Sequence, residues 1–318
     1  MSGGEANKNR WKNLLYYAIT ALALVYFGVF LAKEIPNMPP LQWRGLGSVV
    51  MGGTILLYTA TIGLMGLAWT LLLRDGSVHL PAWRVQTIYA IAQFGKYLPG
   101  NVGQHVGRVV MATAAGIPAA TVLSTMLIEL LWVAGVGATI ALVSLVFFVG
   151  DDAVRSQLHL NPVYLAGGAI MLLAAPWVGT QLLNRLFPKL ASKLAGGGSI
   201  IVPRFRTAMA VGGLVLLCFV TFGVILKLQA DVIFSATNAR FLELTCLFAA
   251  AWLAGFLVPG APGGLGVREM AMVLLLSPAL GESVAAGLGL TLRLITTLGD
   301  LFMFAIGCWM NKFTRERT

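Results

Sequence analysis

Two stretches decide the fold of this chain: Pro99-Gly100-Asn101-Val102-Gly103 and Pro259-Gly260-Ala261-Pro262-Gly263-Gly264. Each interrupts a longer apolar segment, 82–116 in the first case and 242–276 in the second. Because proline lacks a backbone N–H and clashes with the preceding turn, neither segment can be one straight helix. The arms beside each break are roughly 14 to 17 residues, shorter than the ~20 that cross a bilayer. We therefore expect two re-entrant hairpins, each buried among other helices.

The remaining sequence predicts a membrane protein, because 58% of its 318 residues are hydrophobic and only 11% are charged. Six further apolar runs are about as long as a spanning helix must be: 14–31, 47–73, 119–148, 163–183, 208–226 and 283–310. We expect an all-α polytopic membrane protein with six spanning helices and two re-entrant hairpins, or eight spans if the hairpins cross. Residues 1–318 then form a single transmembrane domain.

The excess of basic residues, with a net charge of +10, is explained by orientation in the membrane. The Lys and Arg residues lie in short loops beside apolar spans, and most fall on the face that holds both termini. The positive-inside rule then predicts an inner-membrane protein whose N- and C-termini are cytoplasmic. We expect no nucleic acid among its partners.

Neither cysteines nor histidines form a pattern typical of a metal site or a disulfide framework. All three cysteines lie inside apolar segments, and the three histidines are far apart. The sequence also lacks a nucleophile motif and a nucleotide-binding loop. We expect no metal, no cofactor and no enzymatic activity.

The two broken segments are related by a constant offset, since Pro259 follows Pro99 by 160 residues. The same offset pairs Gly95 with Gly255, Gly100 with Gly260, Gly103 with Gly263 and Arg108 with Arg268. Such self-similarity predicts two repeat units, approximately 10–150 and 160–312. Three predicted spans separate the hairpins, so the second unit is inverted relative to the first. Inverted repeats place a substrate site near the midplane and permit alternating access.

Each copy of the motif reads Pro-Gly-x-x-Gly-x-x-x-x-Arg, a turn followed by a short helix that carries Arg108 or Arg268. Unpaired amides at a helix start and a planar guanidinium both suit an anion, and phosphate fits best. The alternative is that the glycines only permit close packing and that each arginine extends to its own interface.

Further ionisable residues within apolar segments are candidates for the same site, because charges at membrane depth usually face the interior. Glu129 is either a proton-coupling carboxylate or a partner of Arg108 or Arg293. Arg293 and Asp300 lie two turns apart and either line the pathway or neutralise neighbours. Glu269 either tunes Arg268 or caps the helix start. The full set of expected substrate-binding residues is Lys96, Pro99, Gly100, Gly103, Arg108, Glu129, Pro259, Gly260, Gly263, Gly264, Arg268, Glu269, Arg293 and Asp300.

At residues 94–103 with Arg108, and at 259–269, the chain resembles the lysylphosphatidylglycerol synthase transmembrane region, or flippase-like, family. The resemblance implies an integral membrane flippase-like domain. In full-length synthases this domain translocates aminoacylated phosphatidylglycerol, and stand-alone relatives are linked to lipid or polyisoprenoid-sugar pathways. This chain ends at Thr318 without the soluble aminoacyl-transferase domain, so we do not expect it to synthesise a lysyl-lipid.

Together these patterns predict a membrane lipid flippase for an anionic phospholipid or a polyprenyl-phosphate-linked lipid. One alternative is a non-transporting partner of a membrane glycosyltransferase or another lipid-modifying enzyme. Another is a secondary transporter of a small soluble anion, coupled to protons through Glu129 or Asp300.

Overall fold

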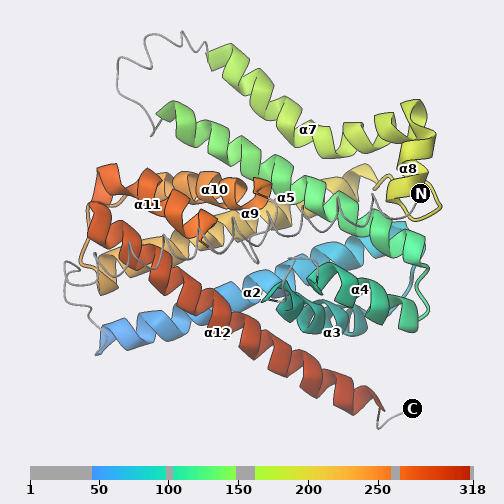
Figure 1. Ribbon diagram of the computed structural model, residues 1–318, viewed down its shortest axis with the longest axis horizontal. Helices are drawn as coiled ribbons and strands as arrows, with labels where there is room; N and C mark the ends of the chain where they lie inside the picture. Colours follow the sequence, from blue (N-terminus) through green and yellow to red (C-terminus); the bar gives the residue numbers. More distant parts are fainter. Residues whose placement is uncertain (1–44, 98–102, 148–161, 259–265, 316–318) are drawn as a thin grey trace, which may run out of the picture.

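The computed structural model describes residues 45–97, 103–147, 162–258 and 266–315 (Figure 1). Within these ranges all regular secondary structure is helical, which confirms the predicted all-α class. The elements in chain order are α2 (Leu46–Asp75), α3 (Ala82–Gln93), η2 (Phe94–Tyr97), α4 (Gly103–Ala114), α5 (Ala119–Phe147), α7 (Pro162–Leu186), α8 (Pro188–Leu194), α9 (Phe205–Leu228), η3 (Gln229–Ile233), α10 (Phe241–Leu257), α11 (Val267–Leu280) and α12 (Glu282–Arg315).

Five of the described helices, α2, α5, α7, α9 and α12, are long and apolar enough to cross a membrane. They coincide with five of the six predicted spans, and the chain is therefore a membrane protein. The remaining predicted span, 14–31, lies outside the described residues.

The two broken segments form pairs of shorter helices, as the proline and glycine stretches predict. The expected arm length of 14 to 17 residues holds for α10 and α11, with 17 and 14 residues, and for the first arm, where α3 and η2 together cover 82–97; it is wrong for α4, with 12 residues. Within the first arm α3 ends at Gln93, where the tighter 3₁₀ turn η2 begins. A 12-residue helix is only about 18 Å long, so α3 and α4 are each too short to span. The breaks themselves, 98–102 and 259–265, lie outside the described residues, and the re-entrant course stays a prediction.

Glycine at one repeated position lets the two arms of each pair touch. A Cβ on Gly95 would lie 2.6 Å from the carbonyl carbon of Gly103, the first residue of α4. A Cβ on Gly255 would lie 3.0 Å from the Cβ of Arg268, in the first turn of α11. The absence of a side chain therefore holds the start of the second arm against the end of the first.

The helix bounds recur at the offset found in the sequence. Shifted back by 160 residues, the stretch from α9 to η3 covers 45–73, beside the 46–75 of α2. Shifted likewise, α10 covers 81–97, beside the 82–97 of α3 and η2. The packing recurs too: α5 packs on α10 as α12 packs on α3, and α9 packs on α5 as α2 packs on α12. The corresponding helices α2 and α9 pack on each other.

The core lies where these helices meet, and it positions the site described below. Among its largest fully buried side chains are Trp69 of α2, Trp132 of α5 and Phe248 of α10. By contrast, α7 lies at the edge of the bundle against α5 (Figure 1). Only 11% of the most apolar stretch of α7 is buried within the protein. The large exposed apolar side chains of α7 are those expected of a lipid-facing helix.

Candidate functional site

A cavity of about 300 Å³ lies between the two halves of the bundle, and both motif arginines line it. Arg108 enters from α4 and Arg268 from α11. Lys96 of η2 and Arg293 of α12 line it as well. The tertiary structure thus brings four cationic side chains, from positions up to 197 residues apart, to one cavity.

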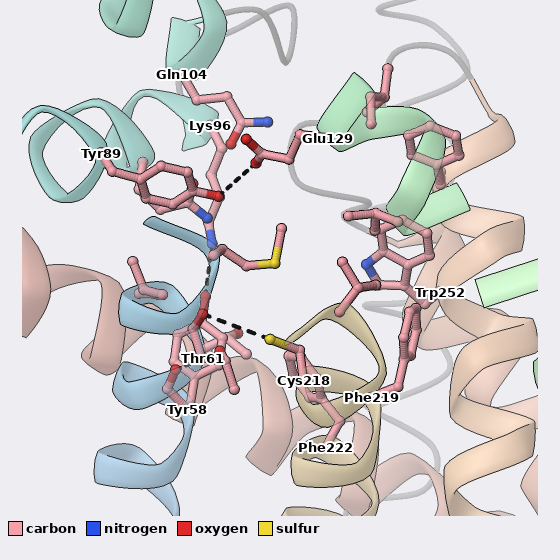
Figure 2. A pocket seen from close by; sticks show the side chains of 18 of the residues that line it. Tyr58, Thr61, Tyr89, Lys96, Gln104, Glu129, Cys218, Phe219, Phe222 and Trp252 are labelled. Atoms are coloured by element: carbon pink, nitrogen blue, oxygen red, sulfur yellow. Dashed lines mark hydrogen bonds between the residues drawn. The ribbon is translucent and has the colours of Figure 1, made fainter. Parts of the chain in front are cut away.

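Arg108 is held in a bidentate ion pair with Glu129 of α5. Its Nη1 lies 3.1 Å from Oε1 and its Nη2 lies 2.6 Å from Oε2. Tyr89 donates from its hydroxyl to the same Oε1 at 3.0 Å (Figure 2). The guanidinium also stacks over the ring of Trp69, 4.2 Å from its centroid, and over Tyr89 at 4.6 Å. The predicted pairing of Glu129 with Arg108 is therefore present in the structure.

The alternative in which the arginines extend to the interface is wrong for both motif residues. Arg108 is 5% exposed and Arg268 is 9% exposed. The Nε of each guanidinium is buried without a hydrogen-bond partner among the described residues. A buried guanidinium with an unused donor is costly unless a further acceptor is bound beside it.

In the second half, Glu269 pairs with Arg268 and also caps the start of α11. Its Oε1 lies 2.8 Å from Nη2 of Arg268, and its Oε2 accepts the backbone N–H of Gly266 at 2.9 Å. The latter bond caps the start of α11, where Gly266 adopts the positive φ of +80° that favours glycine. Arg293 is next to this pair, with Nη1 3.8 Å from Glu269 Oε1.

Lys96 and Asp300 form a third ion pair, whose geometry the sequence did not predict. Lys96 Nζ lies 2.6 Å from Asp300 Oδ2 and donates to the hydroxyl of Tyr58 at 3.0 Å. Tyr58 donates to Asp300 Oδ1 at 2.8 Å, and Tyr97 donates to Oδ2 at 2.5 Å. Asp300 is thus buried and neutralises Lys96. Arg293, two turns earlier on the same helix, lines the cavity.

Among the described residues, the cations of the cavity outnumber the carboxylates that pair with them. Lys96, Arg108, Arg268 and Arg293 stand against Glu129, Glu269 and Asp300, which leaves one positive charge in excess. An excess positive charge, carried in part by the buried Arg108 and Arg268, favours an anionic ligand.

The other side of the cavity is aromatic. Phe219 of α9 and Trp252 of α10 lie opposite Tyr89 (Figure 2), and Phe222 and Phe256 line the cavity as well. Trp252 stacks on Phe256 with ring centroids 5.1 Å apart and meets Phe219 edge-on at 5.6 Å. A cavity that combines cationic groups with aromatic rings suits an amphiphile, whose charged group and apolar chain need different surroundings.

The structure places the predicted site residues in three groups. Lys96, Arg108, Glu129, Arg268 and Arg293 line the cavity, and Glu269 and Asp300 pair with its cations. Gly103 begins α4 and contacts Gly95, while Pro99, Gly100, Pro259, Gly260, Gly263 and Gly264 lie outside the described residues.

Sequence reasoning missed the aromatic residues that hold the charges. Tyr58, Tyr89 and Tyr97 each donate a hydroxyl to a buried carboxylate, and Trp69 covers Arg108. An aromatic residue in an apolar run is normally core, so nothing in the one-dimensional pattern marked these four. The hydroxyl of a tyrosine inside a spanning helix is the only available hint, because it needs a partner there.

The family model for the lysylphosphatidylglycerol synthase TM region matches residues 13–307. The matched range contains both glycine-proline motifs and every residue that lines the cavity. No curated protein sequence matches the chain significantly.

Proposed function

The chain belongs to the family of the lysylphosphatidylglycerol synthase TM region, and on this premise we propose that it moves a phosphate-bearing lipid between the two leaflets of its membrane. The substrate class is an anionic phospholipid or a polyprenyl-phosphate-linked lipid. The observation that carries the proposal is the meeting of both motif arginines at one cavity that also has an aromatic side.

A phosphate group matches the donors that the cavity offers. A guanidinium binds two phosphate oxygens at once, and Arg108 and Arg268 each retain a buried Nε–H without a partner among the described residues. The single excess positive charge equals the charge of one phosphodiester. Glu129 and Glu269 pair with the two arginines, and the lipid phosphate would compete with these carboxylates.

The aromatic side favours a lipid over a small soluble anion. Phe219, Trp252 and Phe256 present ring faces and edges that an acyl or prenyl chain can cover, whereas inorganic anions gain nothing there. The volume of about 300 Å³ is at the lower end for ligand pockets, which fits a headgroup with the first part of its chain.

The recurring helix bounds and packing support alternating access as the mechanism. If the two halves are inverted, exchanging their conformations would open the cavity first to one leaflet and then to the other. In this view Arg108 and Arg268 hold the phosphate in turn. The basic loops that flank the spans favour an inner-membrane location with cytoplasmic termini.

The test is lipid movement in reconstituted vesicles. Fluorescent phosphatidylglycerol is placed in phosphatidylcholine vesicles, and a membrane-impermeant reductant measures how fast the label reaches the outer leaflet. Arg108→Gln/Arg268→Gln should slow this movement at least tenfold, because the phosphate loses both guanidinium contacts. The matched control is Arg206→Gln/Arg240→Gln, which alters two exposed arginines outside the cavity and should move the lipid as the unaltered protein does. Equal rates in both double variants would refute the proposal.

A further inference from the structure

The Lys96–Asp300 cluster joins three elements around one buried carboxylate. Asp300 of α12, whose side chain is 0% exposed, accepts from Tyr58 of α2 and from Lys96 and Tyr97 of η2. Lys96 itself lines the cavity and is 14% exposed. Figure 2 shows its side chain between the Tyr89–Glu129 side of the cavity and Tyr58. The ammonium group is therefore within the cavity wall but is occupied by a carboxylate of the protein.

The fold does not require this cluster. At the offset of 160 residues, Phe256, Ile140, Cys218 and Leu257 stand in the places of Lys96, Asp300, Tyr58 and Tyr97. The equivalent helices α5, α9 and α10 thus pack on one another with no charge at these positions. A buried ion pair contributes little net stability over apolar side chains of similar size, so packing alone does not explain why only one of the two equivalent places carries it.

We infer that Asp300 couples a proton to the lipid anion: the carboxyl takes up a proton when the phosphate enters, and Lys96 turns from Asp300 to the phosphate. The inference rests on the proposed function and adds the co-substrate of the same site. One proton and one anion enter together, while Lys96 stays charged throughout. A lipid moved in this way would follow the proton gradient across the membrane.

The hydrogen bonds of the cluster suit both protonation states of Asp300. Ionised, the carboxylate accepts from Lys96 and from the two tyrosine hydroxyls. Protonated, the carboxyl can donate to one of those hydroxyls, because a phenol oxygen also accepts a hydrogen bond. No buried polar group is then left without a partner when Lys96 departs.

The surrounding charges link protonation to the phosphate. Asp300 lies near Tyr58 of α2, near Lys96 and Tyr97 of η2, and near Arg293 of its own helix. Arg268 of α11 lines the same cavity as Lys96 and Arg293. These cations surround the Asp300 carboxylate with positive charge. A bound phosphate offsets the positive charge of these cations and draws Lys96 away from Asp300. Both effects favour binding of a proton to the Asp300 carboxylate.

The experiment measures protons taken up on binding. Dihexanoyl phosphatidylglycerol is added to the purified full chain in weakly buffered detergent, and a soluble pH-sensitive dye reports the change. We expect uptake of about one proton per lipid bound at alkaline pH, and an affinity that falls about tenfold per pH unit there. Asp300→Asn should bind without proton uptake, and as tightly at alkaline pH as the unaltered protein does at acidic pH.

Two further variants isolate the cluster. Asp231→Asn breaks the Lys227–Asp231 pair, the same chemistry outside the cavity, and should leave proton uptake unchanged. Lys96→Met removes the ammonium group and should bind more weakly without proton uptake, which tests the inference even if Asp300→Asn does not fold. Lipid binding without proton uptake, or undiminished uptake in Asp300→Asn or Lys96→Met, would overturn the inference and leave the proposed function standing. An unaltered protein that does not bind the lipid would refute both.

Discussion

Arg108 shows how a charge is kept inside this membrane protein. Glu129 satisfies two of its nitrogens, and the rings of Trp69 and Tyr89 cover the guanidinium. Trp69 is itself fixed, because its indole N–H donates to Thr125 at 3.0 Å. Breaking such a buried pair by removing one partner costs about 3 to 5 kcal/mol. Under the proposed function, the lipid phosphate would have to replace the contacts between Arg108 and Glu129.

Glu129→Gln tests this competition. Glutamine keeps an acceptor but loses the charge, so we expect the free energy of unfolding to fall by about 1 to 3 kcal/mol. Binding should change in the opposite direction, because Arg108 is released from its carboxylate. Added phosphatidylglycerol should therefore raise the thermal unfolding temperature more in Glu129→Gln than in the unaltered protein.

The control for that experiment is Glu243→Gln, a change in the first turn of α10 outside the cavity. It should alter neither the stability nor the shift caused by the lipid by more than about 0.5 kcal/mol. A smaller lipid shift in Glu129→Gln than in the control would mean that Glu129 helps to hold the lipid and does not compete with it.

At the scale of elements, the hairpin arms depend on glycine contacts. The end of η2 meets the start of α4 at Gly95, and the end of α10 meets the start of α11 at Gly255. Each contact involves a cationic residue of the cavity: Lys96 directly follows Gly95, and Arg268 itself meets Gly255. Separation of the arms would therefore displace the cations as well.

Gly95→Ala should destabilise the protein by about 1 to 3 kcal/mol, because the new Cβ would lie 2.6 Å from the backbone of Gly103. Gly179→Ala on α7 is the matched control, since nothing lies within 4 Å of its Cβ position. The control should be neutral or stabilised by up to about 1 kcal/mol, through helix propensity. Thermal unfolding of both variants in one detergent gives the comparison, and equal unfolding temperatures would contradict the close contact.

At the scale of the whole molecule, two sets of helices repeat the same bounds and packing, while the charged residues differ between them. The first half supplies Lys96, Arg108 and Glu129, and the second supplies Arg268, Glu269, Arg293 and Asp300. Glu129 on α5 pairs with Arg108 on α4, whereas Glu269 is the sequence neighbour of its partner Arg268. Two unlike halves can hold one ligand with unequal affinity from the two sides.

Single-cysteine labelling tests the inverted arrangement, using exposed residues at matching places after α2 and after η3. His79→Cys and Asn238→Cys are introduced separately into a chain without its three native cysteines. With the predicted orientation, a membrane-impermeant thiol reagent should reach position 79 only from the cytoplasmic side and position 238 only from the outside. Labelling of both from the same side would exclude inversion.

Much of the fold follows from local sequence. The length of each apolar run predicts a spanning helix, and the structure has such helices at five of the predicted runs: α2, α5, α7, α9 and α12. Proline and glycine mark the two breaks, because a missing N–H and a missing Cβ act on the backbone at the residue itself. The repeat and the motif arginines could also be found from spacing alone, and the family resemblance is confirmed by the match over 13–307.

The partners of the charges were decided by the tertiary structure. Arg108 could have paired with any nearby carboxylate, and only the packing of α4 on α5 selects Glu129. Asp300 meets Lys96 across 204 residues of sequence, because α12 packs against η2. Ion pairs and stacked rings act over a few ångströms and depend on side-chain direction, which the order of residues along the chain does not encode. The sequence thus determined which residues carry charge into the membrane, and the packing of the two halves determined that they share one cavity.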